Sequence, residues 1–246
     1  MSDSTSELIF LIQKGRAAAF ALELQNLAEE GIQPSIEGAT FQGKTINKFH
    51  FKGLDLTNVA FEQCNLSDCI FEECILEGTF FDNTSMMETA FINCKGEGFA
   101  LDTCTIGQST FSALDLKAPE WSDTQLNECT LAHLNLEEPL LERITLRGGS
   151  LKECVLDSGE LTHVTLREVK HPTQLQLIDC TTQSCYVVSD DEQLPEGFSK
   201  KMIFGGLLDV LDFIDSRRCG YIHDLRTVLA RFMGREEPKA WDVEKQ

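Results

Sequence analysis

The chain has 246 residues, which is enough for one large core with appendages. It carries 21 Lys and Arg residues against 40 Asp and Glu residues, a formal net charge of −19. This acidic excess argues against direct binding to nucleic acid phosphates or to an anionic membrane, because both would repel it. No apolar run approaches the ~20 residues of a membrane span, and the N-terminus lacks the basic start of a secretory signal. We therefore expect a cytoplasmic protein.

Residues 1–35 predict a helix that precedes the rest of the chain. Apolar residues recur at helical spacing from Leu8 to Leu27, including Leu22, and Gly31 ends the pattern. We expect this segment to cap the open end of the structure that follows, because the terminal units of a repeat protein need a polar outer face.

From Ile36 to Leu166 an apolar residue returns at every fifth position. Of the 27 positions in this phase, 26 are apolar and Gly96 is the exception. Neither a helix, with a period of 3.6, nor a flat strand, with a period of 2, keeps one face on a period of five. A fixed repeat of this kind predicts a solenoid, in which each unit buries its apolar face by stacking on its neighbours.

Small side chains occupy the position two residues before many of these apolar centres. They are Val59, Cys64, Cys69, Cys74, Thr79, Thr84, Thr89, Cys94, Cys104, Ser109, Thr124, Cys129 and Cys154. The segments CNLSD (64–68), CILEG (74–78) and CTIGQ (104–108) resemble the unit of the pentapeptide-repeat family, which runs small residue, Asp or Asn, Leu or Phe, and two variable positions. The resemblance implies a right-handed quadrilateral β-helix with four pentapeptides in each coil, so that residues 20 apart stack.

We therefore predict a mainly β protein whose pentapeptide-repeat β-helix spans 36–187 in about seven and a half coils. The repeat is interrupted by a loop at about 167–174, after which it resumes one residue late.

Seven of the ten cysteines occupy the small position, so packing explains them, and a reducing compartment is the simpler interpretation.

Beyond the repeats, residues 188–199 form an acidic linker, and 200–246 predict a helical segment and a tail. The resemblance implies a homodimer formed through this C-terminal end, while the alternative is that the helices cover the last coil of their own chain. The candidate dimer or docking residues are Leu207, Leu208, Leu211, Phe213, Ile214, Leu225, Leu229 and Phe232.

The sequence offers no catalytic motif. None of its five histidines stands at zinc-ligand spacing, and no phosphate-binding glycine loop, nucleophile elbow or paired-carboxylate motif occurs. We expect no enzyme activity, no metal and no cofactor.

Negative charge is concentrated in the middle of the solenoid. Residues 36–187 hold 23 acidic and 10 basic residues, a net of −13. Within them, 53–142 holds 17 acidic residues against Lys95 and Lys117, a net of −15.

The predicted period places these carboxylates in three columns, which we name by their first members. The Glu62 ladder contains Glu62, Asp82, Asp102, Ser122 and Glu142; the Asp68 ladder contains Asp68, Glu88, Gln108 and Glu128; the Glu77 ladder contains Glu77, Glu97, Lys117, Glu137 and Asp157. The remaining face is mixed, with Lys52, Glu72, Ile92, Ser112, Ala132 and Lys152.

Two interpretations follow from these acidic faces. In the first, they keep the protein soluble and block association. In the second, they bind a basic groove, and here the resemblance implies a DNA mimic, since some pentapeptide-repeat proteins bind DNA gyrase or topoisomerase IV. The chain has no loop inserted between Ile36 and Leu166, and the protective members of the family rely on such loops. The alternative function is a protein scaffold unrelated to DNA, which Lys117, Ile92 and Ala132 favour.

Overall fold

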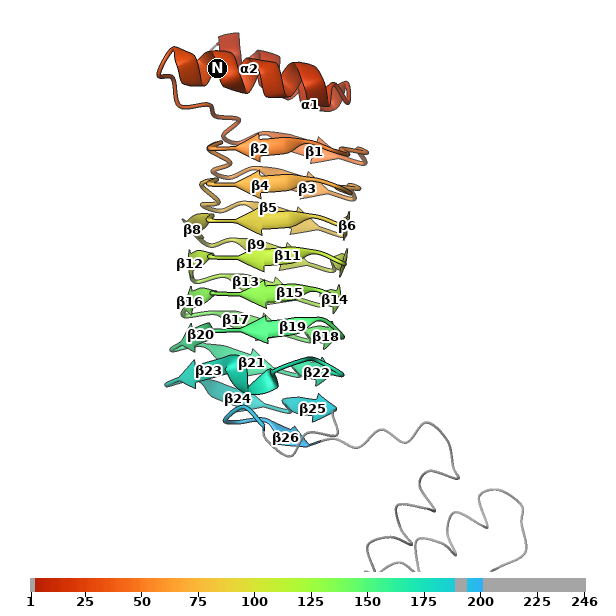
Figure 1. The fold of residues 1–246 in the computed structure, drawn as a ribbon, viewed down its shortest axis with the longest axis vertical. Helices are drawn as coiled ribbons and strands as arrows, with labels where there is room; N and C mark the ends of the chain where they lie inside the picture. Colours follow the sequence, from red (N-terminus) through yellow and green to blue (C-terminus); the bar gives the residue numbers. More distant parts are fainter. Residues whose placement is uncertain (1–2, 189–193, 201–246) are drawn as a thin grey trace, which may run out of the picture. The chain divides into compact units, whose positions relative to one another are not determined.

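The computed structural model describes residues 3–188 and 194–200, which belong to one compact unit, Met1–Lys201. The predicted C-terminal helices and all eight candidate docking residues, from Leu207 to Phe232, lie outside the described residues. Within the described unit, two short helices are followed by a stack of parallel β-coils (Figure 1). Neither of these helices is long and apolar enough to cross a membrane.

The N-terminal segment forms two helices where the sequence predicts one. They are α1 (Asp3–Gln13) and α2 (Ala17–Glu29), and the break falls at Gly15, whose φ of 66° is a left-handed conformation that favours glycine. The chain turns there through hydrogen bonds from the Gly15 and Arg16 amides to carbonyls of the last turn of α1. The buried face of α2 is formed by Phe20, Leu24 and Leu27. Leu22 lies two residues from Phe20 and so on the opposite side of the helix, where its side chain is 60% exposed.

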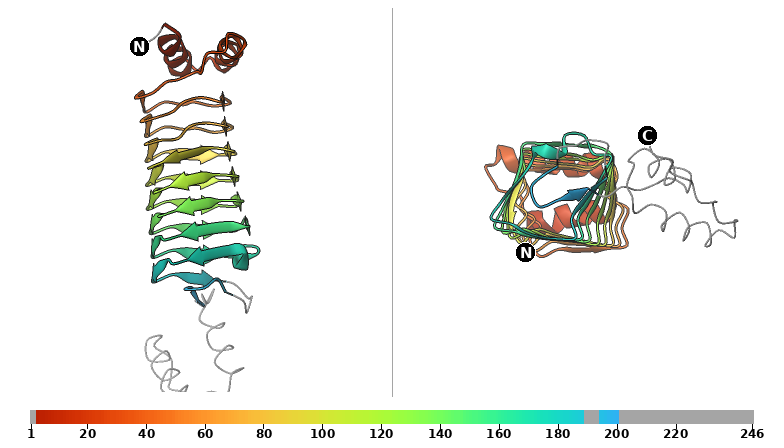
Figure 2. Two further views of the ribbon diagram at one scale, coloured as in Figure 1. Left: turned by 90° about the vertical axis from the view of Figure 1, so that its left-hand side faces the viewer. Right: turned by 90° about the horizontal axis from the view of Figure 1, so that it is seen from below.

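The coils form four parallel sheets, one on each side of a square cross-section (Figure 2). Face 1 contains β1 (Thr40–Gln42), β3 (Ala60–Glu62), β5 (Phe80–Asp82), β9 (Ala100–Asp102), β13 (Glu120–Ser122), β17 (Leu140–Glu142), β21 (Glu160–Thr162) and β24 (Thr181–Gln183). Face 2 contains β6 (Ser85–Met87), β10 (Thr105–Gly107), β14 (Gln125–Asn127), β18 (Thr145–Arg147), β22 (Thr165–Arg167), β25 (Tyr186–Val188) and β26 (Ser199–Lys200). Face 3 contains β2 (His50–Lys52), β4 (Ile70–Glu72), β7 (Ala90–Ile92), β11 (Thr110–Ser112), β15 (Thr130–Ala132) and β19 (Ser150–Lys152). Face 4 contains β8 (Lys95–Glu97), β12 (Asp115–Lys117), β16 (Asn135–Glu137), β20 (Cys154–Asp157) and β23 (Leu175–Ile178).

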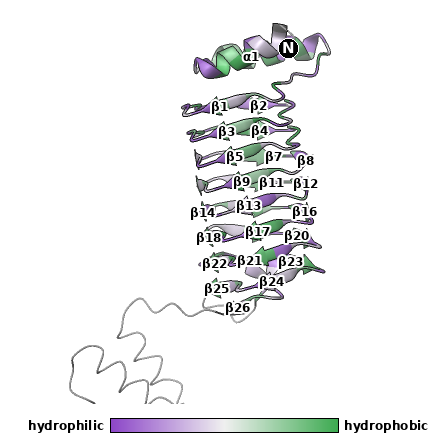
Figure 3. Cartoon of the chain, turned by 180° about the vertical axis from the view of Figure 1, so that it is seen from behind, coloured by the Kyte–Doolittle hydropathy of each residue, from purple (hydrophilic) through white to green (hydrophobic). Residues whose placement is uncertain are grey.

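The strand register confirms that residues 20 apart stack. Phe41 pairs with Phe61 and Phe61 with Phe81, and most strands bury their central residue between two more exposed neighbours. Figure 3 shows the resulting alternation of hydrophobic and hydrophilic segments along the coils. The fold is the predicted mainly β solenoid, with helices at its N-terminal end.

The register changes by one residue near the C-terminal end of the stack. Leu156 pairs with Leu177, an offset of 21 residues, because a short 3₁₀ helix, η1 (Pro172–Gln174), lies between β22 and β23. The following strands keep the offset, since Leu166 pairs with Val187.

Two columns of phenylalanine rings fill the N-terminal half of the core. On face 3 the rings of Phe51, Phe71, Phe91 and Phe111 stack with successive centroid distances of 4.6, 4.6 and 5.1 Å. On face 1 the rings of Phe41, Phe61 and Phe81 stack at 5.2 and 4.9 Å. The two columns meet edge to face, which is a favourable arrangement of aromatic rings.

Phe99 compensates for Gly96 within one coil. A Cβ atom on Gly96 would lie 2.6 Å from the Leu76 carbonyl carbon, so the backbone of the preceding coil excludes a side chain there. Phe99 occupies the position predicted for a small residue, yet it is fully buried, with its ring 5.9 Å from those of Phe81 and Phe91.

Candidate protein-binding faces

The Glu62 ladder lies on face 1 as a line of carboxylates in strand register. Glu62 pairs with Asp82 and Asp82 with Asp102, because each directly follows a buried centre. All three side chains are partly exposed. Ser122 follows in the next coil, and its hydroxyl donates a 2.7 Å hydrogen bond to Asp102 Oδ1. Glu142 ends the ladder and forms an ion pair with Arg143.

Most of these like charges have no counterion. Among the described residues, the acidic partners of ion pairs are Glu72, Asp123, Glu142, Glu153 and Glu168. None of Glu62, Asp82 and Asp102 takes part, although like charges directly opposite on neighbouring strands destabilise a sheet. The fold therefore carries an unneutralised line of carboxylates along face 1.

The Asp68 ladder occupies the corner after face 2. Asp68, Glu88 and Glu128 are exposed, and each adopts a left-handed φ, of 58°, 55° and 54°. Their amides donate to the carbonyl oxygens of the next coil, at Met87, Gly107 and Arg147. This backbone pairing places Asp68 and Glu88 one coil apart. Glu88 and Glu128 are two coils apart, with Gln108 between them.

The Glu77 ladder lies on face 4 and includes a cation. In register, Glu97 pairs with Lys117, and Lys117 pairs with Glu137, which in turn pairs with Asp157. Glu97, Lys117 and Glu137 line a shallow hollow of about 460 Å³, together with Glu77 and Gly96. Face 4 adjoins face 1, and face 1 adjoins face 2. The Glu77 and Glu62 ladders therefore lie on neighbouring faces, and the Asp68 ladder lies at the far corner of the next face.

The mixed face, face 3, carries a local charge cluster and then an uncharged strip. Glu72 accepts hydrogen bonds from Lys52 at 3.0 Å and interacts with His50 Nε2 at 2.7 Å. The hydrogen bond from Lys52 is the main reason that the pKa of Glu72 lies below its usual value. Ile92, Ser112 and Ala132 follow along the same face and have no charge.

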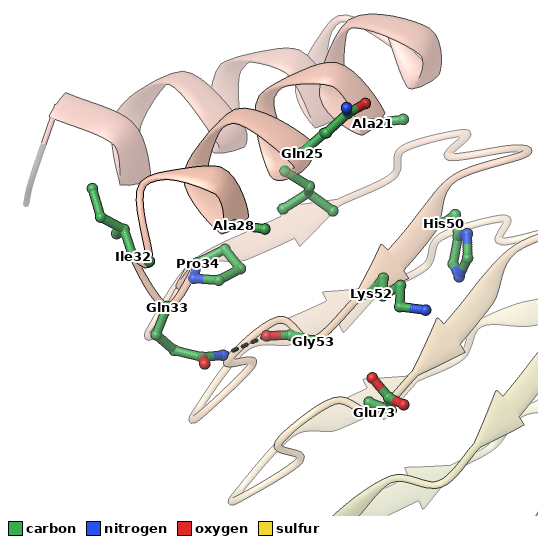
Figure 4. A pocket seen from close by; sticks show the side chains of 12 residues that line it. Ala21, Gln25, Ala28, Ile32, Gln33, Pro34, His50, Lys52, Gly53 and Glu73 are labelled. Carbon is green, nitrogen blue, oxygen red and sulfur yellow. Dashed lines mark hydrogen bonds between the residues drawn. The ribbon is translucent and has the colours of Figure 1, made fainter.

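The sequence did not reveal a cleft of about 580 Å³ at the junction of α2 with the first coils (Figure 4). Its lining includes Ala21 and Ala28 of α2 on one side and His50, Lys52 and Glu73 on the other. A hydrogen bond from the Gln33 side chain to the Gly53 carbonyl closes one end of this junction (Figure 4). Such a site depends on how α2 sits on the coils, and no local motif encodes that placement.

The small positions also donate hydrogen bonds, which the sequence analysis missed. Thr84 Oγ1 donates to the Phe61 carbonyl at 3.0 Å, and Cys64 and Cys74 make the same bond to the carbonyls of Phe41 and Phe51. The sequence did contain a sign of these hydrogen bonds, because Cys, Thr and Ser, the residue types at most small positions, all carry a side-chain donor. The nine described cysteines are free thiols, and no group of metal-ligating side chains gathers among the residues in the described ranges.

The comparison with protein families agrees with the repeats of the sequence. Residues 64–139 match the family model described as a pentapeptide repeat region. A comparison with curated protein sequences found no match.

Similar solved structures share low sequence identity with the chain. Full-length QnrB1, a plasmid-mediated fluoroquinolone resistance protein, is 16% identical over 76% of this chain and 96% of its own, with a TM-score of 0.45. A trypsin-treated QnrB1 variant is 18% identical over 61% of this chain and 84% of its own, also with a TM-score of 0.45. HetL, a pentapeptide repeat protein involved in heterocyst differentiation regulation from the cyanobacterium Nostoc sp. strain PCC 7120, is 12% identical over 70% of this chain and 98% of its own, with a TM-score of 0.17.

Proposed function

We propose that this pentapeptide-repeat protein is a non-enzymatic, cytoplasmic binding protein whose acidic faces dock onto the basic surface of a partner protein. Most specifically, we propose that it mimics duplex DNA on a bacterial type II topoisomerase, DNA gyrase or topoisomerase IV. The observation that carries the proposal is the in-register line of Glu62, Asp82 and Asp102, which have no cationic partner among the described residues.

The density of negative charge supports DNA mimicry. Glu77, Asp82 and Glu88 belong to one coil, in which Glu77 lies on face 4, Asp82 on face 1 and Glu88 at the corner after face 2. Stacked strands lie ~4.8 Å apart, so this coil presents about one carboxylate per 1.6 Å of the stack. Duplex DNA carries one negative charge per ~1.7 Å of its axis. At this coil a groove lined by Lys and Arg that accepts a duplex would therefore meet a similar charge density, whereas the next coil carries two ladder carboxylates, Glu97 and Asp102.

Stacked carboxylates lower the stability of the fold, so we infer that they serve a function that offsets this cost. A partner's Lys and Arg side chains would relieve the repulsion within the Glu62 ladder on binding, and complementary charge would speed association. The chemistry needed is charge presentation on a rigid surface, so no substrate is turned over.

The ladder is tested by paired substitutions and binding to purified gyrase at low salt. We expect Asp82→Asn with Asp102→Asn, which keep side-chain volume, to weaken binding on the order of thirtyfold, since each removes a contact worth about 1 kcal/mol and the two together remove about 2 kcal/mol. Asp82→Lys with Asp102→Lys should weaken it further, because a repulsive pair replaces an attractive one.

The matched control is Glu29→Lys with Glu30→Lys at the exposed end of α2, which changes the net charge as much as the Lys pair does. The control should bind within about twofold of the parent. Equal weakening by the control and the ladder variants would mean that overall charge, and not the Glu62 ladder, governs binding.

A scaffold unrelated to DNA is the second candidate function. Lys117 within the Glu77 ladder and the uncharged strip at Ile92 and Ala132 favour docking through a flat face to another kind of protein surface. The C-terminal candidates from Leu207 to Phe232 are proposed to serve either such docking or a homodimer. Binding by this route should vary little with salt, whereas binding through the acidic faces should weaken.

A further inference from the structure

The core changes in character at Trp121, and a buried cavity of about 50 Å³ lies in the half that follows. Apart from Trp121, the cavity is lined by aliphatic side chains and Cys154, and all of these residues are buried. They belong to the coils in which leucine replaces phenylalanine at the centres.

The cavity arises because side-chain volume falls while the backbone stays in register. On face 3 the column of stacked rings ends at Phe111 and continues with Leu131 and Leu151. The strands on all four faces keep their parallel pairing through this region, so the coils cannot contract around the smaller side chains. The removed ring volume remains as space along the axis.

The lining gives water too few hydrogen bonds. Trp121 Nε1 is buried and has no hydrogen-bond partner among the described residues. The Cys154 thiol already donates toward the carbonyl oxygens of Leu131, at 3.4 Å, and Lys152, at 3.6 Å. A buried water needs 2–4 polar partners, and here one indole N–H is the single uncommitted group on the lining.

We propose that this cavity is a binding site for one small apolar guest, an atom or molecule about the size of xenon. Its volume of about 50 Å³ exceeds the ~10–15 Å³ that one water requires and is well below the ~150 Å³ of an apolar cavity that takes benzene. The guest gains dispersion contacts with leucine side chains that otherwise face empty space. The site is independent of the acidic faces and of their partner.

Xenon is the probe, and Trp121 is the reporter, since heavy-atom contact quenches indole fluorescence. The chain has two tryptophans, so Trp241→Phe leaves Trp121 as the single tryptophan, which is excited selectively at wavelengths that tyrosine does not absorb. We expect its emission to fall saturably with xenon pressure. In the same background, Leu131→Phe should fill the cavity by extending the ring column and should abolish the saturable component.

A second variant keeps the test decisive if the larger ring disturbs folding. Leu161→Ala enlarges the cavity at its lining and should raise xenon affinity several-fold, with far-UV circular dichroism unchanged. The matched control is Leu56→Ala, the same deletion at a fully buried centre outside the cavity lining, which should leave Trp121 quenching as in the parent. Quenching that is linear in pressure, or that Leu131→Phe and Leu161→Ala both leave unaltered, would overturn the proposal.

Discussion

Single side chains at the inner corners join one coil to the next. Cys104 Sγ donates to the Phe81 carbonyl at 3.4 Å, and Thr79 Oγ1 donates to the Leu56 carbonyl at 2.8 Å. Cysteine, threonine and serine interchange at these positions because each is small and carries a donor for a carbonyl that would otherwise be buried with fewer partners. The hydrogen bond, as well as the volume, thus explains the composition of the repeat.

Buried thiols should make the protein sensitive to alkali. Burial raises the pKa of the Cys69 and Cys104 thiols from 9.0 to about 11. Because the folded pKa lies above the unfolded value, the stabilisation is fully present below pH 9 and is lost as the pH rises to 11. We expect the free energy of unfolding, measured by urea denaturation, to fall across this window by up to roughly 2–3 kcal/mol per thiol.

Cys69→Thr combined with Cys104→Thr serves as the control for this prediction, because threonine keeps the corner hydrogen bond and does not ionise in this range. The double variant should show a shallower pH dependence than the parent. Identical slopes would show that the loss of stability has another origin.

Gly96 tests how closely two coils approach. Gly96→Ala places a Cβ atom 2.6 Å from the Leu76 carbonyl carbon, and backbone there cannot move away without breaking the coil register. We expect about 1–3 kcal/mol of destabilisation in urea unfolding. Gly107→Ala is the matched control, since its Cβ would meet only the flexible end of the Met87 side chain. Equal losses in both variants would contradict this account.

At the scale of elements, α2 covers the first coil through one aromatic residue. The ring of Phe20 lies 5.3 Å from that of Phe49 and 5.4 Å from that of Phe51, and all three side chains are buried. Phe49 stands where later coils have a small residue, so the first coil is larger at the corner that the helix covers. The contact continues the ring column of face 3 into the N-terminal helices.

Phe20→Ala should therefore weaken the attachment of α2, which also buries Leu24 and Leu27. We expect a loss of about 3–5 kcal/mol in the free energy of unfolding, the range for truncating a buried phenylalanine. Leu22→Ala on the same helix should change it by less than about 0.5 kcal/mol, because that side chain is exposed. Thermal unfolding of the two variants, measured side by side, should show a lower midpoint for Phe20→Ala than for Leu22→Ala. Similar midpoints would contradict the packing described.

The periodicity of the sequence predicted the β-helix because the period of five holds from Ile36 to Leu166 and resumes after η1. It could not predict the break at Gly15, since a helical apolar pattern runs across that residue. It did not predict that Phe49 and Phe99 would be buried where other coils have a small residue, because core volume is balanced across a coil and not at each position. The columns of the acidic ladders followed from the period alone. The absence of counterions beside Asp82 and Asp102 among the described residues depends on where neighbouring side chains lie.

At the scale of the described unit, the surface charge and the size of the core side chains both change along the axis of the stack. Phenylalanine columns fill the coils that carry the densest carboxylates, including Asp82, which follows Phe81 directly. Aliphatic centres and the cavity lie in the later coils, where Arg143, Arg147 and Arg167 appear. The well-packed half thus supports the surface that we propose binds a partner, since a rigid scaffold presents fixed charges at a lower entropic cost.

The central claim is that the acidic faces act as a duplex mimic, and a supercoiling assay tests it most directly. Purified gyrase and relaxed plasmid are titrated with the full chain at two salt concentrations. We predict inhibition at low salt that weakens strongly at the higher concentration, because the exposed charges are screened. No inhibition at micromolar protein, or inhibition that is equal at both salt concentrations, would contradict the account and favour the scaffold function.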